Sequence, residues 1–305
     1  MRTWTIAAAS VVGFSIGATN AGTPLSTRIY VAELQTEQLY RVAIDWDGQG
    51  TLVASEPELV ATAGAGGGIV VSEFLVYVTG SGVVSRFDLR TGQVSLAQTF
   101  NNANACAPDL SGSFLYCGWS STLHRVPLQP FGNGTPVVLT GDDLNLTDIV
   151  FTPSGESFYS TGTESIIGHF GRIDFDAGQT TRLQSSAFAT GLGWDPYTQR
   201  IMVAGFGRVR MVDPATPTVI DSQRDDSASE NYLSLNADGS GHAIGTRCCV
   251  SDARVVLLDY SETGNLADAQ TLIASAALPG LQFISGEAMF EDERIFHSEF
   301  EEGEP

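Results

Sequence analysis

Short apolar runs separated by turn residues recur along almost the whole chain. A segment of four or five residues with an aromatic or aliphatic centre appears seven times, at intervals of about 40–50 residues. Most copies follow a turn rich in Pro, Asp, Asn or Gly and precede a second apolar run, and none shows sustained helical periodicity. The copies are residues 29–32, 76–80, 115–118, 158–162, 201–205, 242–245 and 295–298.

This spacing predicts a four-stranded antiparallel unit that is repeated along the chain. Such a unit cannot bury both of its faces alone, but radial stacking of several units covers them and leaves short edges. The sequence therefore predicts an all-β fold, a β-propeller over residues 22–300, with seven blades favoured over six. The first copy lacks a leading strand and the last lacks outer strands, so pairing of the two chain ends is expected to close the ring.

The repeats resemble those of YVTN/lactonase-type, gluconolactonase-like β-propeller proteins. The resemblance rests on the run Tyr77-Val78-Thr79-Gly80, on Arg86-Phe87-Asp88, and on related runs in the other copies. It covers nearly all of the chain after residue 21 and implies the propeller fold. It implies less about function, because propellers of this kind include binding proteins and enzymes.

The N-terminus predicts export. Arg2, an uncharged apolar run over residues 5–17 and small residues at 19 and 21 are typical of a secretory signal peptide spanning residues 1–21. An uncleaved anchor is the alternative. No other segment is long and apolar enough to predict a membrane helix. We therefore expect a periplasmic or secreted protein, in which residues 301–305 form an acidic tail.

The charge balance restricts the classes of partner. The formal net charge is -20, and all 15 basic residues are Arg. Nucleic acids and anionic lipid surfaces need basic residues to neutralise phosphate, so neither is expected as a partner. The composition favours solubility and a cation or a basic partner instead.

Four cysteines in an exported chain suggest disulfides. Cys106 and Cys117 stand at equal distances from a hairpin turn at residues 111–112, so a symmetric hairpin places them opposite each other. We predict a bridge between them, with two buried free thiols as the alternative. Cys248 and Cys249 are adjacent, and a vicinal disulfide, two free thiols or an intermolecular bridge are all compatible with the sequence.

Several oxygen-bearing side chains are predicted on innermost strands or on the loops that lead into them. They are Asp148, Asn231 and Glu287, together with Glu230 and Asn104. Converging oxygen ligands can hold Ca²⁺ or another divalent cation. The set Asp148, Asn231 and Glu287 resembles the channel-mouth metal site of gluconolactonase-type propellers, although the flanking residues differ. The alternative is that these are ordinary solvated or capping residues, and the four scattered histidines are read as structural.

Three functions fit these features. The favoured hypothesis is an exported, non-catalytic binding or scaffold module for a protein, glycan or small ligand. The alternative is a metal-dependent, lactonase-like hydrolase with its site at the mouth of the central channel. A third is an accessory subunit of a periplasmic redox enzyme. The sequence singles out no catalytic base.

Overall fold

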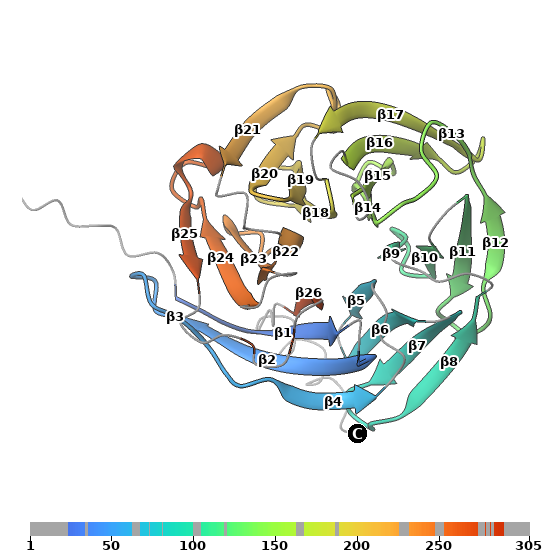
Figure 1. Cartoon of the computed structure of the whole chain (residues 1–305), viewed down its shortest axis with the longest axis horizontal. Helices are drawn as coiled ribbons and strands as arrows, with labels where there is room; N and C mark the ends of the chain where they lie inside the picture. Colours follow the sequence, from blue (N-terminus) through green and yellow to red (C-terminus); the bar gives the residue numbers. More distant parts are fainter. Residues whose placement is uncertain are drawn as a thin grey trace, which may run out of the picture.

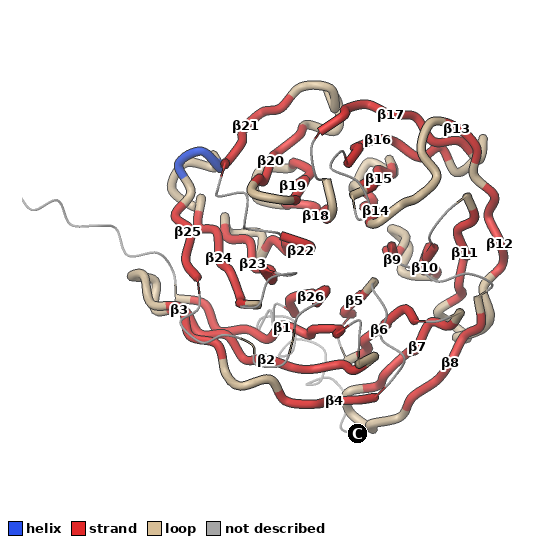
Figure 2. The backbone as a smooth tube through the Cα atoms, viewed as in Figure 1, coloured by secondary structure: helices blue, strands red, loops and turns tan. Residues whose placement is uncertain are grey.

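The described part of the chain is an almost pure β structure. The computed structural model describes residues 24–33, 36–62, 68–72, 74–80, 82–99, 105–118, 121–162, 168–186, 189–225, 232–247, 253–273, 278, 281 and 284–289. Strands dominate them, and one short 3-10 helix, η1 (Leu266–Asp268), is the single helix among them (Figure 2). No helix in these ranges is long and apolar enough to cross a membrane.

The strands form six small sheets that are arranged radially around a central axis (Figure 1). We number these sheets as blades in chain order. Blade 1 contains β26 (Ile284–Met289), β1 (Leu25–Glu33), β2 (Gln38–Trp46), β3 (Leu52–Ala54) and β4 (Glu58–Thr62). Blade 2 contains β5 (Ile69–Ser72), β6 (Leu75–Gly80), β7 (Val83–Asp88) and β8 (Val94–Gln98). Blade 3 contains β9 (Ala105–Pro108), β10 (Phe114–Gly118), β11 (Thr122–Pro127) and β12 (Thr135–Val138).

The second half of the chain continues the pattern. Blade 4 contains β14 (Asp148–Phe151), β15 (Ser157–Thr161), β16 (Gly168–Asp174) and β17 (Gln179–Ser186), with β13 (Thr140–Gly141) added parallel to β17. Blade 5 contains β18 (Gly191–Asp195), β19 (Arg200–Gly205), β20 (Arg208–Val212) and β21 (Ile220–Asp225). Blade 6 contains β22 (Tyr232–Ala237), β23 (His242–Arg247), β24 (Arg254–Asp259) and β25 (Gln270–Ile273).

Burial along each strand follows from its place in the blade. The second and third strands are covered on both faces by neighbouring blades, so β19 and β24 are buried over almost their whole length. Their sequences are accordingly continuous apolar runs rather than alternating ones. The outer strands face solvent, and β12 has no fully buried residue. The core therefore consists of apolar layers between blades.

The predicted ring closure is confirmed. β26 pairs antiparallel with β1, with Arg28 opposite Met289 and Glu33 opposite Ile284. The C-terminal strand thus supplies the innermost strand of blade 1, whose other strands come from the N-terminal part of the chain (Figure 1). This pairing satisfies backbone groups that would otherwise form an open edge.

The preference for seven blades was wrong, because the described residues form six sheets. The sequence counted seven apolar copies, the last of them within residues 284–300. The leading strand of this copy, β26, completes blade 1, so the first and last copies share one blade. The seventh apolar copy, residues 295–298, lies outside the described residues.

The predicted hairpin turns are present where the sequence placed them. In blade 3, Gly112 has φ of 62°, and its N–H donates to the Asp109 carbonyl over 3.0 Å. A side chain is strained in this left-handed conformation, which explains why the turn uses glycine. The turn fixes the register of β9 against β10, and with it the positions of the two cysteines.

Candidate functional site

The six innermost strands all begin at the same end of the central axis. In blades 2 to 6 the chain runs outward from the innermost strand, and in blade 1 the innermost β26 pairs antiparallel with β1 as its counterparts do with their neighbours. The six innermost strands therefore run in the same direction along the axis (Figure 1). Neighbouring innermost strands contact each other around the whole ring. We use the term mouth for the end at which they begin. The first residues of these strands are Ile69, Ala105, Asp148, Gly191, Tyr232 and Ile284.

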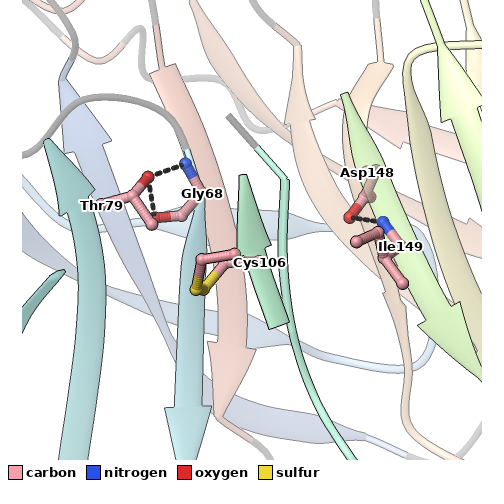
Figure 3. The surroundings of a disulfide bond; sticks show 6 residues. Gly68, Thr79, Cys106, Asp148 and Ile149 are labelled. Atoms are coloured by element: carbon pink, nitrogen blue, oxygen red, sulfur yellow. Dashed lines mark hydrogen bonds between the residues drawn. A yellow bond between two sulfur atoms is a disulfide. The ribbon is translucent and has the colours of Figure 1, made fainter. Parts of the chain in front are cut away.

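Asp148 carries the one carboxyl group among these first residues. Its Oδ1 accepts a hydrogen bond from the backbone N–H of Ile149 over 2.8 Å (Figure 3). Its Oδ2 accepts one from the N–H of Leu192, in the next blade, over 2.7 Å. The carboxyl group therefore bridges β14 and β18 at the mouth, and the residue as a whole is half-buried.

The surroundings of Asp148 favour its protonated form. Burial raises the pKa of Asp148 to about 7, against the opposing effect of the N–H donors of Leu192 and Ile149. Its carboxyl group therefore gains and loses a proton near neutral pH. A group that is poised in this way can serve as a general acid or base.

Hydroxyl groups tie the starts of neighbouring innermost strands together. Thr147 Oγ1 donates to the Thr190 carbonyl over 3.2 Å and lies 3.1 Å from Ser160 Oγ. Ser160 Oγ donates to the same carbonyl over 3.1 Å, and Thr190 Oγ1 donates to the Tyr232 carbonyl over 2.9 Å. These bonds link blades 4, 5 and 6, so the part of the mouth from Asp148 to Tyr232 is held by buried hydroxyls that donate to backbone carbonyls.

Sequence reasoning missed this network. Its signal is a polar residue directly before an innermost strand, as at Thr147 and Thr190. An alignment of the repeats on their innermost strands, instead of on the second strands, would have shown it.

The predicted bridge between Cys106 and Cys117 is confirmed. The two residues lie opposite each other on β9 and β10, with their Cα atoms 4.1 Å apart. Both side chains are buried in the apolar layer between blades 2 and 3, where Figure 3 shows the bridge. It joins the innermost strand of blade 3 to its neighbour. Cys248 and Cys249 lie outside the described residues.

The structure describes two of the three predicted cation ligands, Asp148 and Glu287. Asp148 lies at the mouth, as expected. Glu287 belongs to β26 and pairs with Tyr30, three residues beyond the first residue of that strand. At about 3.3 Å per residue, this is roughly 10 Å along the strand. Asn231, Glu230 and Asn104 lie outside the described residues.

A cation cage is not formed by the described side chains. Among them, no three His, Cys, Asp or Glu side chains are grouped so that they could hold a metal ion. Asp148 has the chemistry of a hard-cation ligand, but it is one carboxylate whose oxygens already accept two backbone hydrogen bonds.

A second polar cluster lies between blades 3 and 4. The buried Asp143 carboxylate accepts hydrogen bonds from Arg182 Nη2 over 2.7 Å, Arg182 Nε over 3.0 Å and Tyr159 Oη over 2.8 Å. His169 Nδ1 lies 2.8 Å from its Oδ1. Burial alone would raise the pKa of Asp143, but bonds from Arg182, Tyr159 and His169 hold it below its usual range. Asp143 is thus an ion with four donors, which anchors the segment leading to Asp148.

A third cluster closes a turn at the end opposite the mouth. Asp238 Oδ2 lies 2.7 Å from His242 Nδ1, and its Oδ1 accepts from the N–H groups of Ser240 and His242. This is the hairpin turn between β22 and β23, as the sequence predicted for residues 236–239. The histidine orients a turn here and is far from the mouth.

The protein resembles known proteins in its fold but not in its sequence. Models of protein families gave no match, and curated proteins gave none either. Among solved structures, virginiamycin B lyase from Staphylococcus aureus, in complex with quinupristin, is similar with a TM-score of 0.53 and 10% identity. That match covers 86% of this chain and 87% of the lyase.

Two further structures are similar over a smaller share of the chain. A calcium-binding protein, regucalcin, from Agrobacterium tumefaciens strain C58 has a TM-score of 0.54 and 13% identity, over 72% of this chain and 77% of regucalcin. A luciferin-regenerating enzyme has a TM-score of 0.54 and 12% identity, over 70% and 78% of the two chains. At these identities the likeness shows a shared fold alone.

Proposed function

We propose that this chain is a lactonase-like hydrolase of the YVTN/gluconolactonase-like propeller type, with its reaction at the mouth. The observation that carries the proposal is Asp148, an ionisable group at the mouth with a pKa of about 7. The similar structures support it, because two of them are named as enzymes and a third as a calcium-binding protein. They support the exported binding or scaffold module less well, although the sequence favoured it.

The chemistry assigned to Asp148 is proton transfer. A water molecule attacks the carbonyl carbon of a ring ester and gives its proton to the Asp148 carboxylate. The bond between the acyl carbon and the ring oxygen then breaks, and the ring oxygen takes the proton from Asp148. The products are a hydroxy acid and the original carboxylate. A group whose pKa lies near the working pH suits both halves of this cycle.

A cation is a separate part of the proposal. Ca²⁺ or another divalent cation, held by Asp148, Asn231 and Glu287, would polarise the ester carbonyl when bound. The proton-transfer steps above use Asp148 and a water molecule, and they are written without the cation.

Export is also proposed. A disulfide between Cys106 and Cys117 is typical of proteins in oxidising compartments. Together with the signal-like N-terminus, it supports a periplasmic or secreted location.

The test is to offer the purified protein a panel of γ- and δ-lactones and aryl esters. Hydrolysis is measured by the release of acid. Each reaction is run after EDTA treatment and again with Ca²⁺, Mn²⁺ or Zn²⁺. Asp148→Asn should lower kcat by about 100-fold or more and remove the pH dependence near pH 7. Asp176→Asn, an exposed acid on a turn of blade 4, is the matched control and should retain full activity.

Absence of hydrolysis across the panel, with and without metal, would overturn the proposal. An Asp148→Asn variant as active as the Asp176→Asn control would also do so. Full activity after EDTA treatment would show that the reaction needs no cation, and the proton-transfer role of Asp148 would stand.

A further inference from the structure

The outermost strand of blade 2 has an open, apolar edge. β8 pairs with β7 on one side, and the described residues place no strand on its other side (Figure 1). Two large apolar side chains of β8 face solvent, with exposed fractions of 46% for Val94 and 62% for Leu96. An unpaired backbone edge that carries exposed apolar side chains is a template for pairing with another strand.

The register of β8 against β7 shows which backbone groups face this edge. The N–H of Asp88 donates to the Gln93 carbonyl over 3.0 Å, and the N–H of Thr99 donates to the Gly82 carbonyl over 2.7 Å. In an antiparallel pair, hydrogen-bonded residues alternate with residues whose N–H and C=O groups point the other way. The residues of β8 that turn these groups away from β7 are therefore Val94, Leu96 and Gln98.

Gln98 is already engaged on this side. Its N–H donates to Asn133 Oδ1 over 2.9 Å, and its carbonyl accepts from the N–H of Gly134 over 3.1 Å. Both partners belong to the segment between β11 and β12 of blade 3. Val94 and Leu96 consequently supply the N–H and C=O groups that remain open along β8.

Outermost strands of other blades carry features that hinder pairing. In blade 4, β13 covers the edge of β17. In blade 3, Pro136 lies within β12 and has no N–H to donate. In blade 5, β21 contains three charged residues, and in blade 1, Glu58 of β4 forms an ion pair with Arg41. Charges and proline are common protections of an edge, and β8, with the sequence Val-Ser-Leu-Ala-Gln, has neither.

A second copy of the same strand matches this edge. When two β8 strands run antiparallel with Ser95 opposite its own copy, Val94 of one chain lies opposite Leu96 of the other. This register uses the open N–H and C=O groups of both residues in both chains, and it leaves Gln98 with its present partners. Because Val94 and Leu96 lie on the same face of β8, the four apolar side chains of the two copies cover one another.

The distribution of charge permits this approach. A formal net charge of -20 makes two copies repel, so a contact between them needs an uncharged surface. Residues 91–104 contain no Asp, Glu, Arg, Lys or His. In the register centred on Ser95, residues 91–99 of one chain face residues 91–99 of the other, so no like charges are opposed along the pairing.

We propose that two copies of this chain form a symmetric dimer by antiparallel pairing of their β8 strands. The two copies of blade 2 then form one continuous sheet across a two-fold axis. β8 lies at the outer rim of the ring (Figure 1), so the innermost strands and the mouth stay outside the contact.

Sedimentation of the purified protein over a range of concentrations tests the dimer. The wild type should change from monomer to dimer as concentration rises, and added salt should favour the dimer because it screens the repulsion between the two chains. Leu96→Lys should weaken association by about 10-fold or more, since it places two like charges on one face of the pairing. Val94→Pro should also weaken it, because it removes an N–H that faces the edge and not one that pairs with β7.

Val138→Lys is the matched control. Val138 is exposed to 64% on β12, which lies in another blade, and this variant should dimerise like the wild type. Melting curves of all three variants are compared with that of the wild type. An unchanged melting temperature in Leu96→Lys would show that its loss of association does not come from unfolding.

A cysteine variant tests the register itself. Ser95→Cys places a thiol opposite its own copy, where antiparallel strands bring Cα atoms to about 4.5 Å, within reach of a disulfide. Mild oxidation should then give more covalent dimer than in the wild type. Thr91→Cys, on the exposed turn before β8, faces residue 99 of the other copy and should not increase it.

Four results would overturn the inference. The first is a wild type that stays monomeric at every concentration and salt. The second is a dimer that persists in both Leu96→Lys and Val94→Pro, because its contact then lies elsewhere. The third is a monomeric chain whose β8 binds an extended segment of a different protein. The fourth is equal crosslinking of Ser95→Cys and Thr91→Cys, which would contradict the register.

Discussion

Gly171 makes room for the ring of Tyr159, and replacing it by alanine tests the cluster around Asp143. An alanine Cβ at this position would lie 2.3 Å from Tyr159 Cζ, 2.4 Å from its Oη and 2.5 Å from the Thr181 carbonyl oxygen. None of these contacts is tolerated in folded proteins. The fully buried Tyr159 ring would have to move, and its hydroxyl would leave the Asp143 carboxylate.

The expected cost has two parts. Loss of a hydrogen bond to a charged acceptor costs about 1.5–3 kcal/mol. Overpacking of a filled interior costs about 1–3 kcal/mol. We therefore expect Gly171→Ala to lose about 3–5 kcal/mol of unfolding free energy. For a large domain, 1 kcal/mol corresponds to about 2–4 °C, so the melting temperature should fall by at least about 6 °C.

Thermal and urea unfolding measure this loss, and two variants serve as controls. Gly132→Ala places its Cβ 3.6 Å from Pro127 Cγ, an ordinary contact, and should change stability by less than about 1 kcal/mol. Tyr159→Phe removes only the hydroxyl. In that background Gly171→Ala should cost less, because the hydrogen bond is already absent. If Gly171→Ala and Gly132→Ala had the same melting temperature, the close packing of Tyr159 over Gly171 would be wrong.

Three other predictions address the bridge, the mouth and ring closure. Cys117→Ala should lose about 2–3 kcal/mol of stability, as expected for a short closed loop, and peptide mapping without reductant should link Cys106 to Cys117; free thiols at both positions would contradict this. Because the pKa of Asp148 is raised to about 7 in the folded protein and is about 4 in unfolded chains, folding should weaken as pH rises from about 4 to about 7; melting curves of Asp148→Asn should lack this loss, and parallel pH profiles would refute it. Deleting residues 284–305, which removes β26, should abolish cooperative unfolding, whereas deleting residues 301–305 should be nearly silent; an unchanged melting curve for the longer deletion would rule out closure through β26.

Local patterns in the sequence were sufficient to predict the strands and turns. The period of the apolar runs predicted four-stranded units, and the turn residues located the hairpins, because both depend on near neighbours in the chain. The same local symmetry predicted the bridge between Cys106 and Cys117. The pairing of residues 286–290 with the first strands followed from the incomplete repeats at the two ends.

The number of blades and the composition of the mouth depend on contacts between distant residues. A repeat pattern counts copies but does not say whether the last copy begins a new blade or completes the first, and the pairing of β26 with β1 decided this. Asp148 was a candidate from sequence, yet its raised pKa depends on burial beside Leu192, 44 residues later. The cluster of Asp143, Tyr159, His169 and Arg182 left no pattern in the sequence, since its members belong to four different segments. The sequence by itself determined the strands and their turns, which are set by neighbouring residues, whereas the tertiary structure decided the environment of each ionisable group, because burial and partners arise only when the blades pack together.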